Sequence, residues 1–137
     1  MALLAHLTEL DLSDMEKLVS LPSSIGMLKG LVKLDVSFCS KLRSLPQEIC
    51  DFKNLAKLDA SDTQISQPPS SIALLNNLIF LSFEGLCLED GEYFVFPGVN
   101  EGLRSLKILN FNFCNIIDGG LPQDIGCLSS LKELHLS

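Results

Sequence analysis

The chain has 137 residues, of which 47% are hydrophobic and 20% charged, and its formal net charge is −7. This length and composition predict one packed domain and exclude a disordered chain. The negative charge repels phosphate groups, so neither nucleic acid nor an anionic membrane surface is an expected partner. No stretch is apolar for long enough to span a membrane.

The beginning of the chain does not have the form of a secretory signal peptide. It carries no basic segment before its apolar residues, and the apolar run is broken at His6. The five cysteines are odd in number and contain no Cys-x-x-Cys pair, which argues against a disulfide framework or a zinc site. We therefore expect a reducing compartment, cytoplasmic or nuclear.

A phrase of the form Leu-x-x-Leu-x-apolar recurs along the whole chain. It begins at Leu7, Leu31, Leu55, Leu78, Leu106 and Leu131. A second phrase, Leu-Pro-x-x-Ile, follows it in three of the repeats, and Pro68-Pro69 to Ile72 is a variant in another. This is the leucine-rich-repeat pattern, whose period is about 20–29 residues. We predict one domain over 1–137, with five repeats and a truncated sixth: 7–30, 31–54, 55–77, 78–105, 106–130 and 131–137.

The spacing of the repeat predicts its local structure. Apolar residues two apart lie on one face of a strand, and no single repeat can bury its leucines without a stacked neighbour. The proline of Leu-Pro-x-x-Ile sets φ for the first turn of a short helix or 3₁₀ turn. The predicted fold class is therefore α/β, a curved leucine-rich-repeat solenoid. Its parallel sheet lines the concave face, and short helices, 3₁₀ turns and loops form the convex face.

The residues that flank the strand leucines are expected to form columns on the concave face, with neighbours about 4.8 Å apart. These columns are charged in the first three repeats and become apolar at Phe80 and Ile108. One interpretation is a solvated face on which Lys33 and Lys57 offset the aspartates. The other is a docking surface for a protein. The candidate binding residues are Glu9, Asp11, Lys33, Asp35, Lys57, Asp59, Phe80, Ser82, Glu84, Ile108, Asn110 and Asn112.

The segment from Leu86 to Gly102 departs from the repeat, because acidic and aromatic residues replace Leu-Pro-x-x-Ile. Phe94 and Phe96 either fill the space that the missing turn leaves, or they belong to a protruding loop that contacts a partner. The candidate loop residues are Glu92, Tyr93, Phe94 and Phe96.

Motifs of catalysis and cofactor binding are missing from the sequence. It contains no Gly-x-x-x-x-Gly-Lys, Gly-x-Gly-x-x-Gly or Gly-x-Ser-x-Gly. His6 and His135 have no second ligand at a metal-binding spacing. We therefore expect no enzymatic activity, no cofactor and no metal site.

Three stretches resemble one class of plant protein. Residues 21–42 combine Leu-Pro-Ser-Ser-Ile-Gly with Leu-Asp-Val-Ser-Phe-Cys, and they lack the Gly-x-Ile-Pro of the extracellular plant type. Together with 96–106 and 114–126 they resemble the repeats of plant intracellular immune receptors of the Toll/interleukin-1-receptor, nucleotide-binding, leucine-rich-repeat class.

The resemblance covers the chain from about Leu7 to Ser137. It implies recognition of a pathogen effector or a host guardee, and autoinhibition through the nucleotide-binding domain of the same receptor. The last repeat stops after Leu136, which indicates a fragment. The alternative is a stand-alone leucine-rich-repeat adaptor or scaffold.

Overall fold

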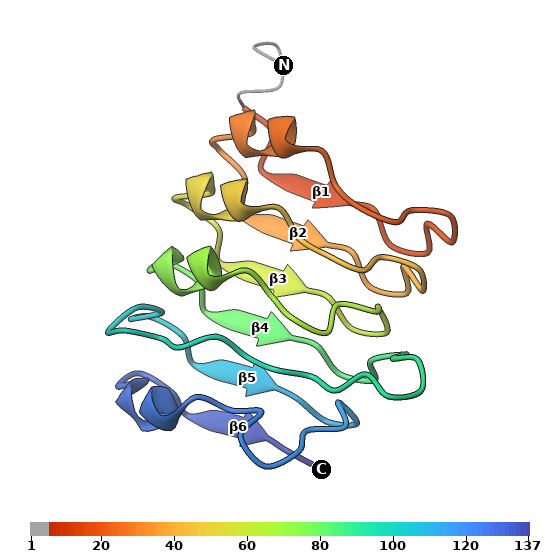
Figure 1. The fold of residues 1–137 in the computed structure, drawn as a ribbon. Coiled ribbons are helices and arrows are strands. Elements are labelled where there is room, and N and C mark those ends of the chain that lie inside the picture. Colours follow the sequence, from red (N-terminus) through yellow and green to blue (C-terminus); the bar gives the residue numbers. More distant parts are fainter. Residues whose placement is uncertain (1–5) are drawn as a thin grey trace.

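The computed structural model describes residues 6–137, and the first five residues, on which the signal-peptide prediction partly rests, lie outside this part. Six three-residue strands form one parallel sheet whose spatial order follows the chain order (Figure 1). The strands are β1 (Glu9–Asp11), β2 (Lys33–Asp35), β3 (Lys57–Asp59), β4 (Phe80–Ser82), β5 (Ile108–Asn110) and β6 (Glu133–His135). The predicted solenoid is confirmed.

The central leucines of the strands hold the sheet in register. Leu34 pairs with Leu58, and this row continues through Leu81 to Leu109, all with no exposed surface. On β6, at the edge of the sheet, Leu134 is 41% exposed because it has a strand neighbour on one side only. Burial of a leucine therefore depends on the repeats on both sides of it.

Four 3₁₀ helices lie along one side of the stack (Figure 1). They are η2 (Ser23–Met27), η3 (Gln47–Asp51), η4 (Ser70–Leu74) and η5 (Gln123–Cys127). A proline with φ between −64° and −71° precedes each helix, and its carbonyl accepts the N–H of the isoleucine three residues later. The Leu-Pro-x-x-Ile phrase thus folds as the predicted 3₁₀ turn, and three of the four isoleucines are buried beneath it.

Two cysteines occupy the predicted position where the chain leaves the strand. The Cys39 Sγ–H donates to the carbonyl oxygen of Leu12, and that of Cys114 donates to the carbonyl oxygen of Phe83. Both side chains are buried, and burial raises the pKa of Cys114 to about 12. The thiol is therefore a small, protonated core side chain that satisfies a carbonyl group of the preceding repeat.

The repeat between β4 and β5 is built differently. No 3₁₀ helix follows β4 before β5, and four phenylalanine rings fill the interior with centroids 5.1–6.4 Å apart. The rings are those of Phe83, Phe94, Phe96 and Phe111. Phe94 and Phe96 are at most 2% exposed, so the protruding-loop hypothesis is wrong for these two residues. They fill the interior that the leucine and isoleucine of Leu-Pro-x-x-Ile occupy in the repeats of η2 and η3.

Candidate protein-binding face

The face of the sheet turned away from the core, which we call the open sheet face, is the predicted concave face. Strand register places Glu9, Lys33, Lys57, Phe80 and Ile108 in one row across β1–β5. A parallel row at the carboxyl ends of the strands consists of Asp11, Asp35, Asp59, Ser82 and Asn110. The structure therefore brings together the strand residues that the sequence singled out.

The candidate residues differ in accessibility. Glu9, Asp11 and Lys33 are exposed, and the others on this face are half-buried, with one exception. Ser82 is only 2% exposed, so it is not available to a partner. Its hydroxyl lies 2.8 Å from that of Ser61 and accepts the N–H of Glu84, and these contacts hold it within the turn.

The row at the carboxyl ends of the strands has a structural task that the sequence analysis missed. A side-chain oxygen of each row member accepts the N–H of the residue two positions later, at 2.9–3.2 Å. The acceptors are Asp11, Asp35, Asp59, Ser82 and Asn110. Such short polar side chains start a turn by replacing a backbone acceptor. The signal was present in the sequence as Asp-x-Ser in three consecutive repeats.

The residue that follows each turn adopts a left-handed conformation, with φ between 57° and 71°. The five residues are Asp14, Phe38, Asp62, Gly85 and Phe113. Aspartate and glycine tolerate this region, whereas a phenylalanine there is an outlier. Phe38 and Phe113 are also 55% and 68% exposed, so core packing does not account for their rings.

The aspartates on this face are not neutralised by direct ion pairs. Among residues 6–137 the ion pairs are Lys29–Asp51, Arg43–Glu89 and His135–Glu133, none of which involves the aspartates of β1–β3. The Lys57 ammonium lies 5.0 Å above the ring of Phe80. The pKa of Asp62 is raised by burial and by the negative charges of Glu84 and Asp59. The edge of the face along β1–β4 is therefore negative.

In the irregular segment only part of the candidate loop is accessible. Tyr93 is 46% exposed and Glu92 is half-buried. The Glu92 carboxylate accepts the N–H of Glu89, whose own carboxylate pairs with Arg43 of the second repeat. These contacts fold the segment against the solenoid.

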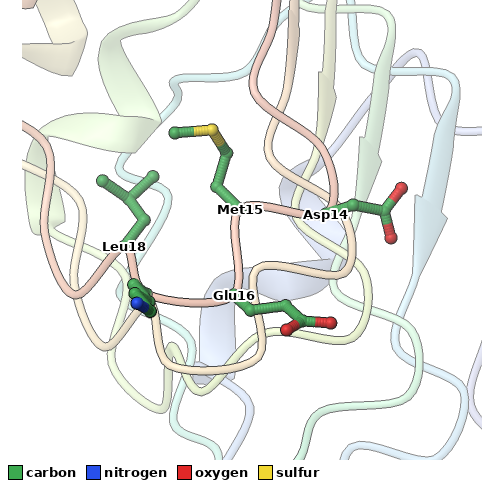
Figure 2. Close-up of a pocket in the computed structure, with 5 residues that line it drawn as sticks. Asp14, Met15, Glu16 and Leu18 are labelled. Carbon is green, nitrogen blue, oxygen red and sulfur yellow. The ribbon is translucent and has the colours of Figure 1, made fainter.

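One surface recess lies in the first repeat and is formed by a single loop, Asp14 to Leu18 (Figure 2). Met15 and Leu18 extend to the same side of the loop, whereas Asp14 and Glu16 point away from them. A smaller recess on the open sheet face is lined by Glu9, Leu10, Asp11, Lys33 and Asp35. No three histidine, cysteine or acidic side chains within 6–137 are grouped so that they could hold a metal ion, and no helix there could cross a membrane.

Known proteins share the repeat and the sequence of this chain. A model of the Leucine Rich Repeat family matches residues 105–128. TMV resistance protein N of Nicotiana glutinosa is 61% identical over 132 residues, which cover 96% of this chain and 11% of that protein. The chain has the leucine-rich-repeat solenoid fold, and it is similar to part of a plant resistance protein. Its predicted resemblance to plant resistance receptors is confirmed, although it spans only about a tenth of the relative's length.

Solved structures agree with this assignment of the leucine-rich-repeat fold. A leucine-rich-repeat protein of Leptospira interrogans superposes with a TM-score of 0.75 at 32% identity, over 87% of this chain and 28% of that one. The leucine-rich-repeat ectodomain of the Arabidopsis thaliana membrane receptor kinase GASSHO1/SCHENGEN3 superposes with a TM-score of 0.74 at 28% identity. The match covers 96% of this chain and 15% of that one. The latter was solved in complex with CASPARIAN STRIP INTEGRITY FACTOR 2.

Proposed function

We propose that this leucine-rich-repeat chain is a protein-binding segment of a cytoplasmic plant disease-resistance receptor. It contributes to recognition of a pathogen effector or host guardee, and to autoinhibition by contact with the receptor's nucleotide-binding domain. The observation that carries the proposal is the 61% identity to TMV resistance protein N across 96% of the chain. The proposed role is binding and not catalysis, because the polar side chains at the ends of β1–β5 serve as hydrogen-bond acceptors within turns.

The open sheet face is the proposed contact surface. The central leucines of β2–β5 point into the core, which leaves the flanking strand residues other than Ser82 accessible to a partner. Phe80 and Ile108 are register neighbours on β4 and β5 and are both half-buried. Such adjacent apolar side chains beside charged ones suit a protein interface. The ectodomain described above, solved in complex with CASPARIAN STRIP INTEGRITY FACTOR 2, is a precedent for partner binding by a solenoid of this fold.

A chimera tests the proposal. The 132 matched residues of TMV resistance protein N are replaced by this chain, and the receptor is expressed in leaves with and without virus. Ion leakage reports the defence response. We expect a receptor that is silent without virus, because the chain supplies the restraint, and a virus-dependent response that Phe80→Ala combined with Ile108→Ala weakens.

The matched control is Met27→Ala combined with Leu74→Ala. These residues end η2 and η4 and are 55% and 57% exposed, so the pair removes two accessible apolar side chains from the other side of the solenoid. Leakage without virus in the chimera would contradict the autoinhibitory role. An equal effect of the two double substitutions would contradict the placement of the contact on the open sheet face.

A further inference from the structure

The irregular segment begins with a loop that reaches across a neighbouring repeat. We call residues 86–93 the strap. Glu89 of the strap follows β4, and its carboxylate pairs at 2.5 Å with the guanidinium of Arg43, which follows β2. The turn after β3 lies between them, because the strands are stacked in chain order (Figure 1). The ion pair therefore joins two repeats that are not direct neighbours.

The backbone of the strap is attached to the solenoid near its two ends. The N–H of Cys87 donates to the carbonyl oxygen of Thr63 at 2.8 Å, and the side-chain amide of Asn115 donates to the carbonyl oxygen of Glu92 at 3.4 Å. The turn between these points bonds to itself. The N–H of Glu92 donates to the Glu89 carbonyl oxygen, and the N–H of Glu89 donates to the Glu92 carboxylate. The turn can therefore move outward without breaking its own hydrogen bonds.

The strap carries a concentration of negative charge. Glu89, Asp90 and Glu92 lie within one turn of the chain, and Glu92 is half-buried. Like charges at such short separations repel one another, and more strongly where water is partly excluded. Of the ion pairs within residues 6–137, the one with Arg43 brings a cation to this group. Loss of the pair would remove an attraction and leave the repulsion.

The closed strap covers apolar side chains. Leu86 and Leu88 are half-buried and pack against the core, whereas Tyr93 at the end of the strap is 46% exposed. Gly85, directly before the strap, and Gly91 within it have φ values of 71° and 84°, a region that glycine adopts without steric cost. An outward movement of the strap would add the two leucines to the exposed surface beside Tyr93.

We propose that the strap opens and closes on the folded solenoid, and that the Arg43–Glu89 ion pair holds it closed. The two side chains are 48% and 59% exposed. Such a pair contributes too little to determine whether the chain folds, but it shifts a local opening equilibrium severalfold. Phe94 and Phe96 stay in the core when the strap opens, since they lie beyond its end. The strap thus controls how much apolar surface the solenoid offers, a property that goes beyond the proposed receptor function.

Hydrogen exchange followed by NMR tests the proposal on the 137-residue chain. The amide of Cys87 reports opening of the strap, because its hydrogen bond to Thr63 must break before exchange. The amide of Val36, which donates to Asp59 at 2.9 Å, reports the solenoid itself. Arg43→Met removes the charge and keeps an apolar side chain. We expect exchange of the Cys87 amide to become about threefold faster, and that of Val36 to stay unchanged.

Lys29→Met is the matched control. It removes the same charge and breaks the ion pair between Lys29 and Asp51, which lies at the end of η3 and not in the strap. We expect less than about a 1.5-fold change at Cys87, because solvent and salt screen a charge that is not in contact with the strap. Equal acceleration of Cys87 exchange by the two substitutions would overturn the proposal and assign the effect to net charge.

Salt and charge reversal provide two further readouts. Raising sodium chloride from about 0.05 M to about 1 M should accelerate Cys87 exchange in the unsubstituted chain, and it should have little effect once Arg43→Met has removed the pair. Arg43→Glu should open the strap further, and adding Glu89→Arg to it should restore slow exchange. A salt response that Arg43→Met leaves unchanged, or a combined variant that exchanges as fast as Arg43→Glu alone, would contradict the role of the pair.

Discussion

The three repeats that carry β1–β3 and the repeat between β4 and β5 reach the same strand register by different means. The regular repeats bury a Leu-Pro-x-x-Ile phrase, or its Pro-Pro-x-x-Ile variant, beneath a 3₁₀ helix, and η2, η3 and η4 stack on one another. In the irregular repeat, Phe94 and Phe96 occupy that interior, yet Leu81 still pairs with Leu109. This difference shows that the leucines of the sheet determine the strand register. The side of the core opposite the sheet needs only enough apolar side-chain volume, from a 3₁₀ helix or from phenylalanines.

The irregular repeat is held to its neighbours by a few close contacts. Gly102 packs against Ala73 of η4, whose carbonyl accepts the N–H of Leu103 at 2.9 Å. On its other side, the Asp124 carboxylate in η5 accepts the N–H groups of Val99 and Asn100. These contacts are made by the irregular segment, so substitutions there test how that segment is held between η4 and η5.

The largest expected effect is that of Phe94→Ala. The ring is fully buried among three others, so its loss leaves a cavity, and we expect the free energy of unfolding to fall by about 3–5 kcal/mol. Urea denaturation followed by circular dichroism measures it. The adjacent Tyr93→Ala is the control, because Tyr93 is 46% exposed and should change stability by less than about 0.5 kcal/mol. Similar losses in both would show that the ring is not a core residue.

The second-largest expected loss of stability is that of Gly102→Ala. A Cβ at this position would overlap the carbonyl oxygen of Ala73, so the backbone must move. We expect the free energy of unfolding to fall by about 1–3 kcal/mol or more. Gly126→Ala in η5 provides the comparison, since nothing lies within 4 Å of its Cβ position. The same denaturation experiment reports both variants. A stable Gly102→Ala protein would mean that the irregular segment does not pack closely against η4.

Phe113→Gly should be a smaller, stabilising change. Glycine relieves the strain of a left-handed phenylalanine, and the gain exceeds the entropy that glycine loses on folding by roughly 0.5 kcal/mol. Gly85→Ala at the equivalent position of the irregular repeat should destabilise, because its φ is 71° and its Cβ would approach the Asp62 carboxylate to 2.6 Å. Thermal unfolding compares the two. A destabilised Phe113→Gly protein would assign the exposed ring a packing role.

The smallest effect concerns acid pH. Hydrogen bonds from the N–H groups of Asn100 and Val99 hold the pKa of Asp124 below its usual 3.8. A depressed pKa in the folded state means that the contact contributes stability above pH 3.8 and loses it as pH falls through the lower value. The amide proton shift of Asn100, followed by NMR, should titrate with a midpoint below 3.8. Asp124→Asn should abolish that titration without affecting η2 or η3.

Much of the open sheet face was predictable from the sequence, because a period of two places alternate residues on opposite faces wherever strands form. The rows through Lys33 and Asp35 followed from this alone. The burial of Ser82 did not, since it depends on the hydroxyl of Ser61 one strand away. The role of the aspartates as turn acceptors was visible in the Asp-x-Ser spacing but was interpreted only as surface charge.

The sequence by itself determined the repeat, the strand positions and the 3₁₀ turns, because each depends on residues close together in the chain: leucine spacing, a proline, an acceptor two residues before a donor. Only the tertiary structure decided that Phe94 and Phe96 are core residues. Their burial depends on Phe83 and Phe111, which directly follow β4 and β5 and reach the same interior only when the repeats stack. Contacts between repeats are long-range in the chain, and no local pattern encodes which irregular segment will fill the space between two strands.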